Sequence, residues 1–223
     1  MIQAILFDMD GVLIDTEKYL TKFWRQAAAE YGIVITEEES YQYRSFASKF
    51  AAPFFAEKHG SQEDYRKIRA RRKEIMKGHL EKNGLEKKDG VDEVLPKLKK
   101  MGYEIAVVTA TDEERAKDYL TKIGIYDFFD DVICATMVER GKPYPDVYLY
   151  ACERIGKKTS ECIAVEDSPN GIRAAYTAGC HVVMIPDLTQ PDEETKKMLD
   201  YKADSIRDIP KIVKDWEKTS WED

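Results

Sequence analysis

The chain has 223 residues, of which 35% are charged, and its formal net charge is −7. This length suits one main hydrophobic core, with or without a smaller inserted domain. The acidic balance argues against binding to nucleic acids or anionic membranes, so we expect neither as a partner. The longest apolar runs are far short of a membrane span, and the N-terminus enters a strand directly, which predicts a soluble cytoplasmic protein.

The chain opens with an apolar run, Gln3 to Phe7, that leads into Asp8 and Asp10. Such a run predicts a buried strand of a parallel sheet, whose ligands bind outside the carboxyl ends of the strands. Gly11 permits the sharp turn that follows. Two carboxylates one residue apart repel each other unless a cation or a proton lies between them, which indicates Mg²⁺ or a protonated carboxyl. Ordinary turn chemistry of aspartate is the alternative.

Residues 16–87 carry several amphipathic helical patterns and no convincing strand, so we predict an inserted, small α-helical cap domain there. The remaining segments, 1–15 and 88–223, form the predicted core domain. Because the two linkers are adjacent, such a cap can hinge over the strand ends and exclude water when it closes.

Three cap helices are expected. Apolar residues recur on one face between Tyr19 and Tyr31, Thr36 begins a second helix with a capping box, and a third runs from Ser61 to Asn83. The aromatic stripe that includes Trp24 is interpreted as core packing. A basic cluster on the third helix is interpreted as a solvated helix face rather than a nucleic-acid contact; it comprises Arg66, Lys67, Arg69, Arg71, Arg72 and Lys73.

From Val91 onward, helical and strand patterns alternate with short connections, which predicts an α/β fold with a doubly wound parallel sheet. The expected strands are 104–109, 131–134, 162–166 and 180–185, and the expected helices are 92–101, 112–122, 145–155 and 169–178. A last strand within 204–209 and a closing helix through Trp216 complete the prediction.

Polar residues end three of these predicted strands. Thr109 and Ala110 precede a helix, whose free amides would form half of a phosphate cradle. Lys142 lies in a proline-stiffened loop, where a point positive charge can hold phosphate oxygens. Glu166 and Asp167 form a second acidic pair, and oxygen ligands from two strands suit Mg²⁺. Each feature alone has an ordinary alternative, namely a helix cap, a surface lysine or a turn, but their joint occurrence at strand ends favours one site.

The four cysteines, Cys134, Cys152, Cys162 and Cys180, have no CxxC spacing and lie mostly within apolar stretches. They predict buried free thiols rather than disulfides. The three histidines share no metal-ligand spacing, so we expect packing or surface roles for them.

The ordered motifs DMDGV, TAT, GKPYPD and VEDSPNGI resemble the haloacid dehalogenase superfamily, and in particular its branch of β-phosphoglucomutase and related sugar-phosphate and nucleotide phosphatases. The resemblance implies a Rossmann-like core, with the small cap where this chain carries its helical insertion. It also implies Asp8 as the nucleophile that forms an aspartyl-phosphate and Asp10 as the general acid and base. Thr109, Ala110 and Lys142 match phosphate-binding positions.

The resemblance further implies that Mg²⁺ is held by Asp8, the backbone carbonyl of Asp10, and the acidic pair Glu166 and Asp167. The expected function is a Mg²⁺-dependent phosphatase that hydrolyses small phosphomonoesters, either sugar phosphates or nucleotides, and we expect a monomer.

Two other functions remain open. The mutases of this branch usually carry a histidine where this chain has Leu20, and an arginine in a glycine-containing cap segment, where this chain has Arg44 in YRSFAS. Both departures rank a phosphosugar mutase below the phosphatase. Arg44 itself is interpreted as a surface arginine, with substrate contact as the alternative. A catalytically silent binding protein is the third reading, although Asp8, Asp10, Lys142 and Asp167 form a complete chemical set.

Overall fold

The core is a parallel sheet with helices on both faces, and a computed structural model describes residues 1–219. Its spatial strand order is β3-β2-β1-β4-β5-β6. The strands are β1 (Ala4–Phe7), β2 (Glu104–Thr109), β3 (Asp131–Cys134), β4 (Cys162–Glu166), β5 (His181–Met184) and β6 (Tyr201–Lys202), and each pairs in parallel with its neighbours. The chain extends the sheet from β1 first to one side and then to the other, which confirms the predicted doubly wound α/β fold.

The central strand β1 is buried on both faces. Ala4 and Leu6 belong to one hydrophobic cluster, and Ile5 and Phe7 belong to the other, as the alternation of a strand requires. Helices cover both sides, which explains why this strand is continuously apolar in sequence.

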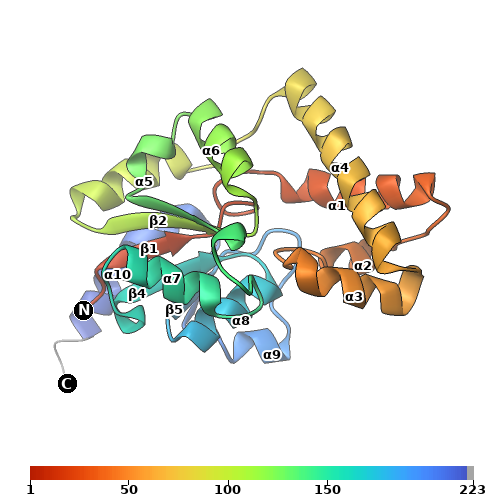
Figure 1. The fold of residues 1–223 in the computed structure, drawn as a ribbon. Helices are drawn as coiled ribbons and strands as arrows, with labels where there is room; N and C mark the ends of the chain where they lie inside the picture. Colours follow the sequence, from red (N-terminus) through yellow and green to blue (C-terminus); the bar gives the residue numbers. More distant parts are fainter. Residues whose placement is uncertain (220–223) are drawn as a thin grey trace.

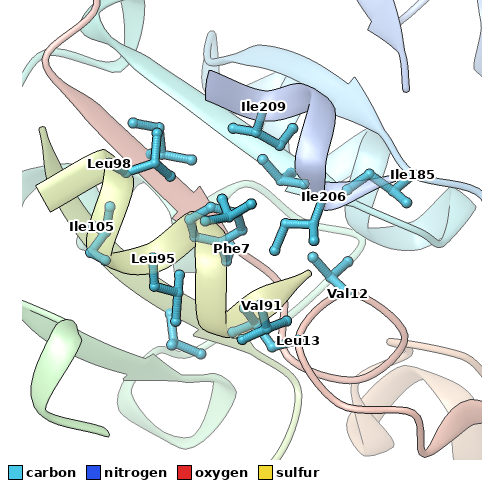
Figure 2. Packing of buried hydrophobic residues seen from close by; sticks show 14 of the residues in the cluster. Phe7, Val12, Leu13, Val91, Leu95, Leu98, Ile105, Ile185, Ile206 and Ile209 are labelled. Atoms are coloured by element: carbon cyan, nitrogen blue, oxygen red, sulfur yellow. The ribbon is translucent and has the colours of Figure 1, made fainter. Parts of the chain in front are cut away.

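Five helices form the two outer layers. The cluster around Phe7 is closed by α5 (Val91–Lys100), α6 (Glu113–Lys122) and α10 (Ile209–Thr219), and Figure 2 shows Leu95 and Leu98 beside Phe7. The opposite face is covered by α7 (Asp146–Arg154) and α8 (Pro169–Ala178). Each fully buried aliphatic side chain in these layers contributes about 1.5–3 kcal/mol. A short helix, α9 (Glu193–Lys196), precedes β6.

A separate group of four helices, called the cap below, follows β1 and lies to one side of the sheet (Figure 1). These helices are α1 (Glu17–Glu30), α2 (Glu37–Tyr41), α3 (Ser48–His59) and α4 (Gln62–Asn83). The capping box predicted at Thr36 is present. Ser61, the predicted start of the third helix, also forms a capping box. Trp24 packs in the cap's own hydrophobic cluster with Tyr43 and Phe55.

The two connections between cap and core run side by side. Asp15 N–H donates to Glu86 O (2.9 Å), and Lys88 N–H donates to Leu13 O (3.0 Å). The division of the chain into a cap of residues 16–87 and a core stays our prediction. A hinge between two such parts requires linkers that lie side by side, as these do.

Two sequence predictions need correction. The last strand is not within 204–209: β6 is Tyr201–Lys202, and the predicted residues form a turn and the 3-10 helix Ile206–Asp208. Ser205 caps that helix through a capping box, and Ile206 and Ile209 bury their side chains at helical spacing. In the cap, the helix begun by Thr36 ends at Tyr41, and α3 is an additional, unpredicted helix.

All four cysteines are buried free thiols, as predicted. Within residues 1–219, every helix is too short or too polar to cross a membrane.

Candidate active site

The predicted site residues meet where three neighbouring strands end. Asp8 follows β1, Thr109 ends β2 and Glu166 ends β4. Because β2 and β4 both pair with β1 in parallel, their carboxyl ends lie at one edge of the sheet. The strand order changes direction at β1, and the crevice at such a switch point is where doubly wound sheets bind their ligands.

Lys142 joins two of these strand ends. Its side chain is fully buried, and Nζ donates to Asp8 Oδ1 (2.6 Å), Glu166 Oε1 (2.6 Å) and Val108 O (2.8 Å). All three N–H groups of the ammonium are therefore used. Burial would lower the pKa of Lys142, but the carboxylates of Asp8 and Glu166 outweigh it and hold that pKa above its usual range. The lysine is a permanent positive charge that offsets two buried carboxylates.

Asp8, Glu166 and Asp167, called the acidic cluster below, place ligand oxygens within 4.8 Å of one another. Asp8 Oδ2 and Asp167 Oδ1 are buried and accept no hydrogen bond from any described residue. Burial raises the pKa of Asp8, with Lys142 opposing it, and burial likewise raises that of Asp167, with Arg44 opposing it. Buried carboxylate oxygens without donors fit a hard divalent cation such as Mg²⁺.

Two glycines make room for this cluster. A Cβ on Gly11, whose φ is 85°, would lie 2.2 Å from Asp167 Oδ2, and a Cβ on Gly171 would lie 2.1 Å from the Glu166 carboxylate. No other residue type fits at either position without moving a carboxylate. The glycine of DMDGV, in the turn after β1, and the glycine of VEDSPNGI, in α8, therefore both make room for the same acidic cluster.

Asp10 lies apart from these three carboxylates, at the wall of a cavity of about 80 Å³ between cap and core. Its oxygens accept hydrogen bonds from the hydroxyls of Thr16 (2.5 Å) and Thr111 (3.0 Å). Thr109 is fully buried and its hydroxyl accepts from Thr111 N–H (3.0 Å), while Ala110 lines the cavity. The two aspartates of DMDGV therefore face different surroundings, one held by a lysine and one held by hydroxyls beside a cavity.

Arg44 is not a surface residue, contrary to the sequence interpretation. Its side chain is only 2% exposed, and it reaches from the cap into the core to pair with Asp167 and, at 3.3 Å, with Glu17. It also donates to the Thr189 hydroxyl (3.1 Å). The next residue, Ser45, has a φ of 50°, a left-handed conformation that non-glycine residues rarely adopt and that often marks functional segments.

The basic cluster of α4 also needs correction at one member. Arg72 is buried against Trp24, with its guanidinium carbon 5.2 Å from the ring centroid, and it lines the cavity. Arg69, half-buried, lines the same cavity. The sequence alone does not show whether arginines on one helix face lie in solvent or line a cavity, because the packing of the cap decides which face is covered.

Sequence reasoning missed one buried partner of the acidic cluster. The Tyr148 hydroxyl donates to Glu166 Oε1 (2.6 Å), and the side chain is fully buried on α7. Its position in the helix that follows the GKPYPD loop is the available signal, since that helix packs against β2, β3 and α8. Glu166 thus accepts hydrogen bonds from both Lys142 and Tyr148.

Comparison with known families agrees with this geometry. A family model for haloacid dehalogenase-like hydrolases matches residues 5–185, which include strands β1 to β5, the cap and the strand ends described above. The chain belongs to the haloacid dehalogenase superfamily of hydrolases. The membership predicted from the four motifs is confirmed, together with the α/β core and inserted cap.

Several characterised relatives of this haloacid dehalogenase-like hydrolase bear names of phosphatases. The phosphorylated carbohydrates phosphatase of Thermotoga maritima is 30% identical over 181 residues, which are 79% of this chain and 82% of the relative. Hexitol phosphatase A of Escherichia coli is 30% identical over 185 residues, 82% of either chain. A solved β-phosphoglucomutase from Clostridium difficile shares the fold, with a TM-score of 0.82 and 23% identity over 98% of this chain and 99% of that one.

Proposed function

We propose that this hydrolase is a Mg²⁺-dependent phosphatase of small phosphorylated sugars, which acts through an aspartyl-phosphate on Asp8. The observation that carries the proposal is the acidic cluster: Asp8 has one carboxylate oxygen held by Lys142 and the other buried without a donor among the described residues. An oriented carboxylate oxygen with no partner is available for attack on phosphorus. The names of the two phosphatase relatives support the substrate class.

In the first step, Asp8 Oδ2 forms a bond to phosphorus while the bond to the ester oxygen breaks. Asp10 gives its proton to that leaving oxygen. In the second step Asp10 takes a proton from a water molecule, whose oxygen attacks phosphorus and releases Asp8 and inorganic phosphate. The hydroxyls of Thr16 and Thr111 hold Asp10 at the cavity wall, which is where a leaving alcohol would lie.

Asp8, the carbonyl of Asp10, Glu166 and Asp167 would hold the Mg²⁺ ion. When bound, it supplies positive charge against the transferring phosphoryl group. Asp167 offers its donor-free Oδ1 to the ion, whereas the donor-free Oδ2 of Asp8 is the atom that attacks phosphorus, and Glu166 already accepts from Lys142 and Tyr148. Glu166 therefore also holds Lys142 in place.

Lys142, Thr109 and Ala110 would bind the transferred phosphate. Lys142 donates its three N–H groups to protein oxygens, so contact with phosphate requires one of these bonds to be exchanged or shared. The backbone next to Thr109 and Ala110 leads into α6, whose N-terminal amides favour anions.

A phosphosugar mutase is the second candidate, because the fold is also that of a solved β-phosphoglucomutase. Leu20 lines the cavity at the position where mutases of this branch usually carry a histidine. An apolar side chain there can neither donate to nor accept from a sugar hydroxyl. We therefore infer hydrolysis as the main reaction, in a monomer located in the cytoplasm.

A panel of phosphomonoesters with Mg²⁺ tests the proposal. We expect phosphate release from sugar phosphates, its loss in excess chelator, and a loss of about 10³-fold or more in Asp8→Asn. Asp118→Asn, on an exposed face of α6, is the matched control and should keep wild-type rates. Turnover that Asp8→Asn leaves unchanged would contradict the proposal. Isomerisation of β-glucose 1-phosphate with a bisphosphate primer, faster than phosphate release, would favour the mutase.

A further inference from the structure

The cavity beside Asp10 is lined by more positive charge than the proposed chemistry uses. Three arginines, called the arginine wall below, line this cavity. Arg69 and Arg72 come from α4 of the cap, and Arg115 comes from α6 of the core. They share the cavity with Asp10 but belong to other elements than Lys142, Thr109 and the acidic cluster. The cations proposed for the transferred phosphate, Lys142 and the Mg²⁺ ion at the acidic cluster, are therefore separate from this wall.

Arg72 is the central member and lacks an anionic partner. The residue is 8% exposed, and its Nε is buried without an acceptor. No carboxylate within residues 1–219 forms an ion pair with Arg72 or Arg69, whereas Arg115 pairs with Asp112 (2.8 Å). Burial lowers the pKa of Arg72 to about 10, with Arg69 and Arg115 adding like-charge repulsion. A buried guanidinium without an anion is costly, so such a group calls for a ligand.

A groove with basic side chains adjoins the cavity at Arg69. A groove of about 450 Å³ between α3 and α4 shares Tyr65 and Arg69 with the cavity, and its other basic side chains are Lys49, Arg66 and Lys73. No aspartate or glutamate is among the described residues that line it. Lys49, Arg66 and Lys73 each pair with a carboxylate outside this lining, so Arg69, at the boundary with the cavity, is the basic side chain of the groove that has no ion pair within residues 1–219.

We propose that the arginine wall binds a second anionic group of the substrate, a phosphate or a carboxylate, while the first phosphate is transferred at Asp8. The inference rests on the proposed function and narrows its substrate class to phosphomonoesters with two anionic groups. Guanidinium groups bind either anion through paired N–H donors, which a neutral sugar hydroxyl cannot match in strength. The wall lines the same cavity as Asp10, the residue proposed to give its proton to the leaving oxygen.

Three substrates on one carbon skeleton test this inference: glucose 6-phosphate, glucose 1,6-bisphosphate and 6-phosphogluconate. We expect kcat/KM of the wild-type protein to be about tenfold or more higher for at least one doubly anionic substrate than for glucose 6-phosphate. Preference for the bisphosphate assigns a phosphate site, and preference for the gluconate assigns a carboxylate site. Arg72→Gln should remove the preference through KM, because kcat/KM falls more for the preferred doubly anionic substrate than for glucose 6-phosphate.

Arg71→Gln is the matched control, because Arg71 is the neighbouring residue on α4 but is paired with Glu30 and Glu74 and lines neither cavity nor groove. It should keep the wild-type preference. Arg69→Gln, at a less buried position, gives a second variant should Arg72→Gln fold poorly. Calorimetric titration of the three compounds into Asp8→Asn measures the same preference as binding, without turnover.

Equal kcat/KM for all three substrates in the wild type, or an equal loss on all three in Arg72→Gln, would overturn the second-anion site while leaving the phosphatase intact. Absence of turnover across the whole phosphomonoester panel would instead overturn the proposed function. The two failures are thus distinguishable.

Discussion

Buried charged side chains have partners of opposite charge in the acidic cluster of the core, but two arginines of α4 on the cap side of the cavity lack them in the described part of the chain. On the core side, each carboxylate of the acidic cluster lies near a cation from the protein itself: Lys142 holds Asp8 and Glu166, and Arg44 holds Asp167. On the cap side, Arg69 and Arg72 have no carboxylate partner within residues 1–219. The buried carboxylates thus have their cations within the protein, whereas Arg69 and Arg72 are the residues proposed above to bind an anionic group of the substrate. Under the proposals above, the chemistry lies mainly with residues of the core and the selectivity mainly with Arg69 and Arg72 of the cap, although Arg44 reaches from the cap to Asp167.

The comparison predicts opposite responses to the removal of a buried cation, and the largest effect belongs to Lys142. Lys142→Met leaves two buried carboxylates without their cation, so we expect a loss of about 3–5 kcal/mol in the free energy of unfolding, together with loss of activity. Denaturant titration at neutral pH measures it. Lys122→Met, an exposed lysine on α6 paired only with Asp118, should change stability by less than about 1 kcal/mol. Equal stability of the two variants would break the comparison.

The buried carboxyl of Glu17, at the contact between cap and core, predicts that the free energy of unfolding depends on pH. Burial raises the pKa of Glu17 from 4.5 to about 8, although Arg44 opposes the shift. A raised carboxyl pKa means that the protonated form is favoured in the fold, so its stabilising contribution is full below about pH 4.5 and is lost as pH rises through about 8. Within that window each pH unit removes up to about 1.4 kcal/mol.

Thermal unfolding across this pH range in chelator, for wild type and Glu17→Gln, measures the Glu17 contribution. The curve of Glu17→Gln should be flatter over the window, while that of the exposed Glu63→Gln should follow the wild type. Parallel curves for all three proteins would show that Glu17 titrates as it does in the unfolded chain.

Metal binding should stabilise the core side alone. With Mg²⁺ at about 100 times its Kd, we expect about 2.7 kcal/mol of added stability, seen as a rise in Tm. Asp167→Asn, which removes a ligand of the acidic cluster, should abolish the rise, whereas Arg72→Gln should keep it. A rise that persists in Asp167→Asn would place the cation elsewhere.

The smallest effect is expected on the cap side. Arg72→Met removes a buried charge that has no anionic partner, and the cation–π contact with Trp24 is the main interaction lost. We expect a change of no more than about 1 kcal/mol in the free energy of unfolding, in either direction. Denaturant titration beside Lys142→Met gives the contrast directly, and a loss as large as that of Lys142→Met would show that Arg72 has a structural role.

The same division explains what the sequence could predict. Asp8, Thr109, Lys142 and Asp167 each follow a strand or open a loop in the parallel core, and the rule that strand ends share one edge brings them together without knowledge of packing. These residues belong to the motifs in the sequence, and their roles in the site stay a prediction.

Arg44 and Arg72 could not be placed in this way. Arg44 meets Asp167 across 123 positions of sequence, and the contact depends on how four cap helices pack against one another and over the core. Helical periodicity gives one apolar face, but not which polar residues of the other face a neighbouring domain covers. The short strand β6, with two exposed residues, is likewise set by the strand beside it rather than by its own pattern.

A covalent phosphate on Asp8 is the central claim, and acid quenching tests it most directly. Wild-type protein is mixed with ³²P-labelled sugar phosphate and Mg²⁺ and quenched in acid within the first turnovers. We expect protein-bound label that hydroxylamine releases, that maps to the peptide containing Asp8, and that is missing from Asp8→Asn. Label on another residue, or phosphate release that continues in Asp8→Asn, would contradict the account.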